Sequence, residues 1–282
     1  RDNGYFVARA YLPQQTIKDG IIEIAIIEGT YGGFDIKNSS LVNDSEVQNF
    51  MDYLKNGQTV STESLERQML LINDLSGVIV TNAEVYPGKE VGTSNFVITT
   101  NPTNQYTGYS IVDNYGSRYT GEYRLNAGAT VNSVSKVGDS LGVSGLISNT
   151  ANLKNAGVNY ERPLGYSGLK GSLNASTTEY EMDKIPNYDA FGTAKNVGAG
   201  LSYPIVKTRS YSQTVYLDYT HKIMDDTSGA IANTEKSEKS VDSVTLKLDE
   251  KRNTNLFDHS GKLTTSIGIT GGNANMDNSV AQ

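Results

Sequence analysis

The pattern of apolar and polar positions changes once along the chain, at the Asn101-Pro102 dipeptide. Before it, helical and strand-like patterns are mixed; after it, apolar and polar residues alternate along the chain. In residues 121–132, Leu125, Ala127 and Val131 alternate with polar or small residues. Because successive side chains of a strand point to opposite faces, this pattern predicts strands with one apolar and one wet face.

Nine segments share this alternation after residue 105. The strands that they predict, each about 8–12 residues long, match the length of a tilted membrane-spanning strand. The sequence therefore predicts about nine antiparallel strands of a transmembrane β-barrel. A soluble β-sandwich or a fibrous adhesin remains the alternative, because a sheet with one wet face also alternates. The segments are 108–114, 121–132, 141–148, 156–161, 169–178, 196–203, 213–220, 243–249 and 262–270.

The connections between these strands are expected to alternate in length. In outer-membrane barrels the extracellular loops are long and the periplasmic turns are short. Residues 181–195 and 224–240 are predicted to be long outer loops, and 163–168 and 207–212 short turns on the other side. Tyrosines near the strand ends are candidates for an interfacial aromatic girdle. They are Tyr109, Tyr123, Tyr160, Tyr180 and Tyr203.

Residues 1–101 predict a mixed α+β region. Residues 5–12 and 21–27 are expected to pair as strands, and a third strand is expected at 33–37. A helix is predicted from the cap at Asn43 to about Asn56, with Phe50 and Leu54 on its apolar stripe and Gly57 ending it. A second helix, capped by Ser61, precedes strands at 79–86 and 95–99. The order from 33 to 99 is thus β-α-α-β-β, and residues 1–28 resemble the last two strands of a preceding copy.

Composition narrows the possible functions. Hydrophobic residues make up 37% of the 282 positions, Cys is absent, and 31 acidic against 24 basic residues give a net charge of −7. Interspersed charges of this sign argue against a nucleic-acid partner, and the lack of Cys excludes disulfides and thiolate sites. His221 and His259 have no metal-ligand spacing, and residues 271–273 open no helix that would cradle a phosphate. We therefore expect neither catalysis nor a cofactor nor a nucleotide.

Three segments carry a family resemblance. Residues 4–14, followed by Gly20 and Gly29, closely resemble the end of the first POTRA domain of two-partner secretion transporters. These are the haemolysin/filamentous haemagglutinin secretion–activation family, within the Omp85 superfamily. Residues 160–166 are similar to a short turn of that family. The family's first barrel hairpin turn, D-N-x-G-x-x-x-T-G, is matched here by Asp113, Asn114, Gly116, Thr120 and Gly121.

The resemblance implies two POTRA domains, an N-terminal plug helix and a sixteen-stranded barrel. On this basis residues 1–28 are expected to end the first POTRA domain, 29–101 to form the second, and 102–282 to begin the barrel. About nine of the sixteen expected strands are then represented, and we expect truncation at both ends. The family's inward-folded loop, with its Val-Arg-Gly tip, has no counterpart, since no Arg-Gly dipeptide occurs.

The resemblance also implies a function. An outer-membrane transporter, with its POTRA portion in the periplasm, would recognise a large secreted exoprotein and pass it through the pore. The exposed sheet edge expected to bind the client comprises Ile79, Thr81, Ala83 and Val85, with Phe50 and Leu54 either lining an adjacent groove or forming core. An Omp85-type assembly factor and a β-rich surface adhesin remain alternatives. Residues expected to line the barrel lumen are Glu122, Arg124, Asn126, Lys170, Asn174 and Lys247.

Overall fold

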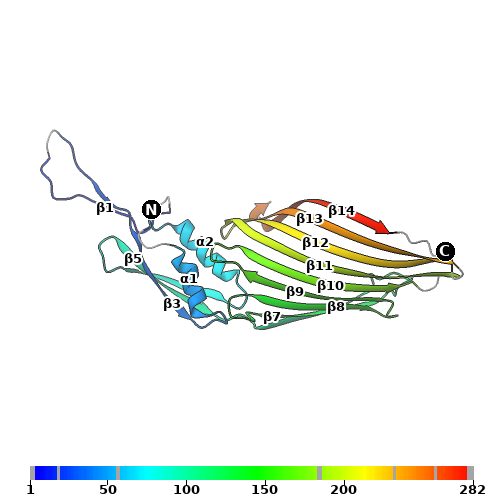
Figure 1. Ribbon diagram of the computed structural model, residues 1–282. Coiled ribbons are helices and arrows are strands. Elements are labelled where there is room, and N and C mark those ends of the chain that lie inside the picture. The colour runs from blue at the N-terminus through cyan, green and yellow to red at the C-terminus, as the bar shows by residue number, and fades with distance from the viewer. Residues whose placement is uncertain are drawn as a thin grey trace.

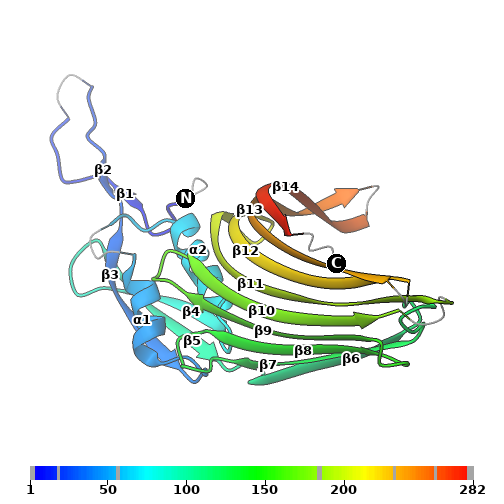
Figure 2. The same ribbon diagram turned by 45° about the vertical axis from the view of Figure 1, so that its right-hand side comes forward.

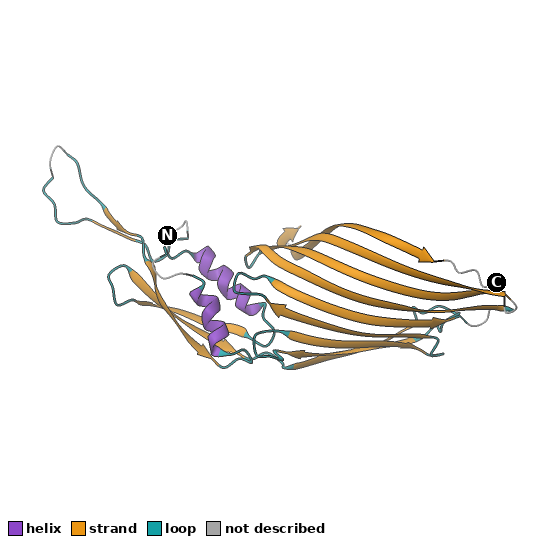
Figure 3. Ribbon diagram, viewed as in Figure 1, coloured by secondary structure: helices purple, strands orange, loops and turns teal. Residues whose placement is uncertain are grey.

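The computed structural model describes residues 4–17, 20–54, 58–182, 186–230, 233–256 and 259–277. These residues form three sheets and two helices (Figure 1). A two-stranded hairpin projects from one end, a three-stranded sheet with both helices follows, and a nine-stranded sheet makes up the rest. Figure 3 shows that the helices lie where the small sheet meets the large one.

The N-terminal hairpin is shorter than the sequence pattern predicts. β1 (Arg9–Tyr11) pairs with β2 (Ala25–Ile27) over only three residues each. Ile22, Ile24 and Ile26 stay more than half exposed, because no second layer covers them. Asp19, in the connection, lies outside the described residues.

The next segment is the predicted β-α-α-β-β unit. It consists of β3 (Thr30–Asn38), α1 (Asp44–Asp52), α2 (Thr62–Asn73), β4 (Ile79–Pro87) and β5 (Thr93–Asn101). The sheet order is β3-β5-β4, with β5 parallel to β3 and antiparallel to β4. The last strand therefore runs in the centre and β4 lies at an edge, as predicted.

The predicted C-terminal end of the first helix was wrong, and the predicted N-terminal cap of the second helix is confirmed. α1 ends at Asp52 rather than near Asn56, and Leu54 is buried in the turn that follows it. The helix was predicted to be too long because Leu54 continues the apolar stripe and packs into the same core, although its backbone is not helical. Lys55, Asn56 and the expected stop at Gly57 lie outside the described residues. α2 begins as expected: the Ser61 hydroxyl accepts a hydrogen bond from the Ser64 N–H at 3.1 Å.

The core of the β-α-α-β-β unit lies between its sheet and the two helices. Tyr31, Phe34 and Phe96 form an aromatic cluster with ring centroids 5.4–5.5 Å apart. Around it pack the buried apolar side chains of both helices and of β5. They include Val47, Phe50, Met51, Ile72 and Ile98.

Nine long strands form the second part, and the predicted number is confirmed for the described residues. Each strand pairs antiparallel with its neighbour in sequence, so the order runs from β6 to β14 without a crossover. Figure 2 shows that this sheet curves across its width. The strands are β6 (Tyr106–Asp113), β7 (Arg124–Asn132), β8 (Ser140–Ser148), β9 (Leu153–Pro163), β10 (Lys170–Glu181), β11 (Tyr188–Lys207), β12 (Tyr211–Ala230), β13 (Asn233–Leu256) and β14 (His259–Asp277).

The two predicted long outer loops are instead mostly strand. β11 and β12 each have 20 residues and β13 has 24, so most of 181–195 and nearly all of 224–240 is paired. The β12–β13 ladder continues to the pair Ala230–Asn233. The prediction failed because the one-sided apolar alternation ends there, while backbone pairing does not depend on side-chain polarity. An ion pair across the ladder, Lys239 to Asp226 at 3.2 Å, adds to it.

The turn between β7 and β8, residues 133–139, contacts the β-α-α-β-β unit directly. The Asn43 N–H donates to the Lys136 carbonyl at 2.8 Å, and the Ser76 N–H donates to the Gly138 carbonyl at 3.1 Å. A Cβ on Gly138 would lie 2.7 Å from the Leu75 Cβ. The two parts of the chain therefore meet backbone to backbone, at a distance that a side chain at residue 138 would prevent.

Asp139 holds this turn in shape. Its side chain is 1% exposed and accepts hydrogen bonds from the Ser135 N–H, the Ser135 hydroxyl and the Tyr160 hydroxyl, the last at 2.8 Å. Burial by itself raises the pKa of Asp139, but the Ser135 and Tyr160 hydrogen bonds outweigh it and hold the pKa below its ordinary value.

We predict that Gly138→Ala weakens the docking of the turn more than Gly165→Ala does. Both glycines have positive φ, +83° and +84°, but a Cβ on Gly165 would meet nothing within 4 Å. The clash with Leu75 should add about 1–3 kcal/mol to the cost of the Gly138 variant, the usual range for overpacking. Urea unfolding of the intact protein, followed by circular dichroism, measures the difference; equal losses would contradict the close contact.

We also predict a pH-dependent effect of Asp139→Asn. A carboxylate with a lowered folded pKa contributes stability that is present above its unfolded pKa, about 3.9, and is lost as the pH falls through the folded value. The variant should be about 1–3 kcal/mol less stable than the parent at pH 7. The gap should shrink at pH 3, because the carboxyl of the unfolded parent is then mostly protonated, whereas the folded carboxyl binds its proton only at lower pH. A gap of the same size at both pH values would show that the charge of Asp139 plays no part.

Candidate functional site

β4 presents an open edge of the small sheet. Ile79, Val85 and Tyr86 are 44%, 46% and 49% exposed. The Gly88 N–H donates to the Thr93 carbonyl at 2.9 Å, and hydrogen-bonded pairs alternate along an antiparallel ladder. Tyr86 and Glu84 therefore bond toward β5, whereas the N–H and C=O groups of Val85 and Ala83 point away from the sheet. Thr81 lies at a register shift between Val80 and Asn82.

The opposite edge, along β3, is partly occupied. The Tyr31 N–H donates to the Gln58 carbonyl at 3.0 Å, and the Gln48 side chain donates to the Phe34 carbonyl at 3.2 Å. Of the two edges, β4 is therefore the more open to an added strand.

Phe50 and Leu54 do not line a groove. They are 1% and 8% exposed and belong to the core cluster, so assigning them to client binding was wrong. An apolar helical stripe is expected both for a binding groove and for a core, so the sequence pattern did not distinguish the two, and the packing in the structure does. Phe50 does meet the second part of the chain: its ring lies 5.3 Å from the ring of Tyr166, edge to face.

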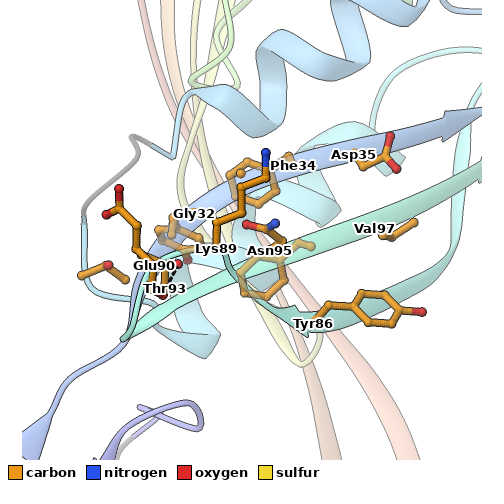
Figure 4. A pocket seen from close by; sticks show the side chains of 13 residues that line it. Gly32, Phe34, Asp35, Tyr86, Lys89, Glu90, Thr93, Asn95 and Val97 are labelled. Carbon is orange, nitrogen blue, oxygen red and sulfur yellow. Dashed lines mark hydrogen bonds between the residues drawn. The ribbon is translucent and has the colours of Figure 1, made fainter.

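A cleft of about 780 Å³ lies at the end of the small sheet that is farther from the large one. Figure 4 shows Lys89 and Glu90, from the β4–β5 turn, beside Gly32 and Phe34 of β3. Two consecutive glycines, Gly32 and Gly33, leave the β3 backbone bare there. Tyr86 lines the cleft and also lies on β4, so the cleft and the open edge are continuous.

The large sheet has two faces of opposite character. Residues paired across the ladders share a face, and Arg124, Asn126, Lys170, Asn174 and Lys247 all fall on one of them, the polar face. The other, the apolar face, carries side chains that are the more exposed ones. They include Leu125 (43%), Leu173 (60%), Val197 (60%), Leu217 (48%) and Leu246 (52%). Exposed apolar and shielded polar residues invert the arrangement of a soluble protein and fit a lipid-facing surface.

Three cations of the polar face are paired with carboxylates. Arg124 bonds to Asp113 at 2.8 Å, and Lys170 to Glu161 at 2.8 Å. Lys247 bonds to Asp249 at 3.0 Å and lies 4.2 Å from the centre of the Tyr216 ring.

Glycines on the polar face accommodate larger neighbours. A Cβ on Gly198 would lie 2.8 Å from the Asn174 side chain, and one on Gly128 would lie 2.6 Å from the Tyr109 ring. The Tyr109 hydroxyl donates to Asn126 at 3.2 Å. Small and large residues thus interlock between strands on this face.

Three sequence-based assignments near strand ends need correction. Glu122 is in the connecting turn, because β7 starts at Arg124. Tyr109 and Tyr180 lie on the polar face rather than in an outward girdle, and the Tyr180 hydroxyl donates to Asp226 at 2.9 Å. Tyrosine occurs on both faces, so residue type did not indicate which face each one takes.

The row of apolar residues on the apolar face ends partway along β12 and β13. Val215, Leu217 and Tyr219 are followed on the same face by His221, which contacts Asp242 at 2.8 Å. An ionisable pair at this height indicates that the strands continue beyond the hydrocarbon layer.

The signature turn, residues 113–121, closes the β6–β7 hairpin at the end remote from the small sheet. The Asp113 carboxylate accepts the Tyr115 N–H at 2.9 Å as well as Arg124, and the Gly116 N–H donates to the Glu122 carbonyl at 3.0 Å. Thr120 and Gly121 are buried, with φ +108° at Gly121, while Asn114 is exposed.

No helix in the described ranges is long and apolar enough to cross a membrane. Within the same ranges, no group of three or more His, Asp or Glu side chains is placed to hold a metal ion.

A β-α-α-β-β unit joined to an antiparallel sheet with an exposed apolar face defines a POTRA-containing β-barrel protein. Residues 92–282 match the model of the protein family described as "Haemolysin secretion/activation protein ShlB/FhaC/HecB". Residues 1–29 match the model of the family described as "POTRA domain, ShlB-type". The chain belongs to the ShlB/FhaC/HecB family of haemolysin secretion/activation proteins.

Several named proteins are similar to this chain in sequence or in fold. The heme/hemopexin transporter protein HuxB of Haemophilus influenzae is 32% identical over 252 residues, 88% of this chain and 44% of HuxB. The outer membrane transporter CdiB of Dickeya dadantii is 25% identical over 61% of this chain and 31% of its own length. Among solved structures, CdiB from Acinetobacter baumannii gives a TM-score of 0.71 at 17% identity, covering 97% of this chain and 51% of that one. CdiB from Escherichia coli gives 0.67 at 18%, covering 94% and 55%. The chain thus spans about half the length of these relatives or less.

We predict that Asp113→Ala destabilises the hairpin more than Asp113→Asn does. The amide keeps an oxygen that accepts the Tyr115 N–H and loses only the charge toward Arg124, whereas alanine removes both partners. The difference should be about 1 kcal/mol, the usual net value of one hydrogen bond. Heat-modifiability of the intact protein on gels, measured against temperature, reports it; identical midpoints would contradict the role of the turn.

Proposed function

We propose that this protein is part of an outer-membrane transporter that captures a large secreted exoprotein in the periplasm and passes it through the barrel. Residues 102–282 lie in the outer membrane, and residues 1–28 and 29–101, as parts of two POTRA domains, lie in the periplasm. The observation that carries the proposal is the union of an open β4 edge with a sheet whose polar face is shielded and whose apolar face is exposed. The named relatives HuxB and CdiB, both transporters, support it.

Capture is assigned to β4. An extended client segment adds as a fourth strand, and the free N–H and C=O groups of Ala83 and Val85 supply its first hydrogen bonds. Backbone pairing of this kind does not require a particular client sequence. The exposed Ile79 and Val85 side chains and the cleft at Tyr86 add selectivity.

Passage is assigned to the polar face. Arg124, Lys170 and Lys247 are each neutralised by a carboxylate, and Asn126 and Asn174 present amides. A wet surface of paired charges holds an unfolded chain weakly, so the client slides rather than binds. Outer-membrane lipid covers the apolar face. The process uses no nucleotide, nucleic acid or catalytic group of this chain, and client folding outside the cell supplies the direction.

We predict that Val85→Pro reduces exoprotein secretion strongly, whereas Val85→Ala does so only weakly. Proline removes the N–H that points away from the sheet and leaves the β5 ladder intact, while alanine keeps the N–H and removes the side chain. The measurement is exoprotein in the culture medium of cells that carry the intact transporter gene with either change, at equal barrel abundance. Normal secretion by Val85→Pro would exclude β4 as the docking edge.

A further inference from the structure

Three turns of the large sheet contact the β-α-α-β-β unit, all at the same end of the strands. They are residues 133–139, 164–169 and 208–210, which connect β7 to β8, β9 to β10 and β11 to β12. Figures 1 and 2 both show these turns beside α1 and α2. The first turn makes the backbone contacts described above.

The second turn contacts both helices through one residue, Tyr166. The Tyr166 hydroxyl accepts a hydrogen bond from Asn49 of α1 at 2.9 Å, and the Tyr166 carbonyl accepts one from Gln68 of α2 at 2.9 Å. Gln68 is 2% exposed and also donates to the Phe50 carbonyl at 2.6 Å. One residue of the barrel turn is therefore bonded to both helices at once, and its ring packs on Phe50 within the core cluster.

The backbone beside Tyr166 is equally close to α2. A Cβ on Gly168, which has φ +98°, would lie 2.7 Å from the Leu71 side chain and 2.9 Å from Pro204. After the tyrosine the turn is thus fitted closely to the surface of α2, whereas a Cβ on Gly165, before it, would meet nothing within 4 Å.

The third turn and the end of β11 that precedes it contribute polar and charged contacts to the same unit. Lys207 bonds to Asp74 at 2.6 Å, and Arg209 bonds to Glu66 at 3.1 Å. Arg67 donates to the Pro204 carbonyl at 2.6 Å. The Arg209 side chain is 78% exposed, and exposed ion pairs contribute little, so the Arg209 contact adds less to the docking than the partly buried Tyr166 does.

We propose that Tyr166 is a positioning residue for transport: its side chain locks the β-α-α-β-β unit in one orientation at the mouth of the barrel. This inference rests on the proposed function, because the fixed orientation keeps the β4 edge aligned with the polar face. A client strand bound at β4 then leads into the barrel along one path. Loss of the anchor leaves both folds intact but frees their relative orientation.

The test measures orientation and secretion separately. The chain has no native Cys, so Ser45→Cys on α1 and Ser144→Cys on β8 introduce two defined spin-label sites. In the intact protein in membranes, pulsed electron paramagnetic resonance should give a narrow distance distribution. Tyr166→Ala should broaden it and lower secretion by roughly tenfold or more, since a packed aromatic ring is lost. Tyr166→Phe, which keeps the ring and loses only the Asn49 bond, should restore most of both.

Controls separate the possible outcomes. Tyr115→Ala, an 81% exposed tyrosine in the opposite turn, should leave the distance distribution unchanged. Should Tyr166→Ala fail to assemble, Asn49→Ala removes a single contact with the phenol and should broaden the distribution more mildly. An unchanged distribution in Tyr166→Ala, or a broadened one with normal secretion, overturns the proposal. Normal secretion by Val85→Pro together with a broadened Tyr166→Ala distribution would instead reject the β4 docking edge and retain the anchor.

Discussion

Backbone hydrogen bonding between neighbouring strands is the constraint on which the rest of this structure depends. In a hydrocarbon layer each unpaired N–H or C=O group costs several kcal/mol, so a strand crosses a membrane only when both of its edges are paired. Consecutive antiparallel hairpins satisfy this condition with short connections for β7 to β13, and the order from β6 to β14 runs without a crossover. Beyond the apolar band the β12–β13 ladder continues to the pair Ala230–Asn233, because backbone pairing does not depend on side-chain polarity.

Pairing fixes which side chains share a face, and the faces then take opposite roles. The polar face carries three ion-paired cations and glycines that interlock with larger neighbours, whereas leucines and valines are exposed on the apolar face. The small sheet uses the reverse logic. Its edge strand β4 leaves backbone groups unpaired in water, where they remain available to a partner strand. Neighbouring strands of the large sheet thus pair their backbone groups in the membrane, whereas the edge strand β4 of the small sheet leaves backbone groups unpaired in the periplasm.

The contact between the β-α-α-β-β unit and the turns of the large sheet is closely packed. Gly77, Gly138 and Gly168 each lie where a Cβ would come within 3.0 Å of a side-chain atom across the contact. Tyr166 and the buried Gln68 connect a barrel turn to both helices. A hinge between freely moving domains would not need contacts this close. The geometry indicates that the small sheet is presented to the barrel in a fixed way.

The amino-acid sequence by itself determined the β-α-α-β-β order, the Ser61 cap, nine alternating strands and the face to which Arg124, Lys170 and Lys247 belong. These features are local or periodic, so they can be recognised without knowledge of distant contacts. Only the tertiary structure decided that Phe50 and Leu54 are core, that Tyr109 faces the polar side, that β11 to β13 extend past the apolar band, and that Tyr166 sits between α1 and α2. Each of these features depends on contacts with residues that are distant in the sequence, and residue type and spacing do not show which distant residues will be in contact.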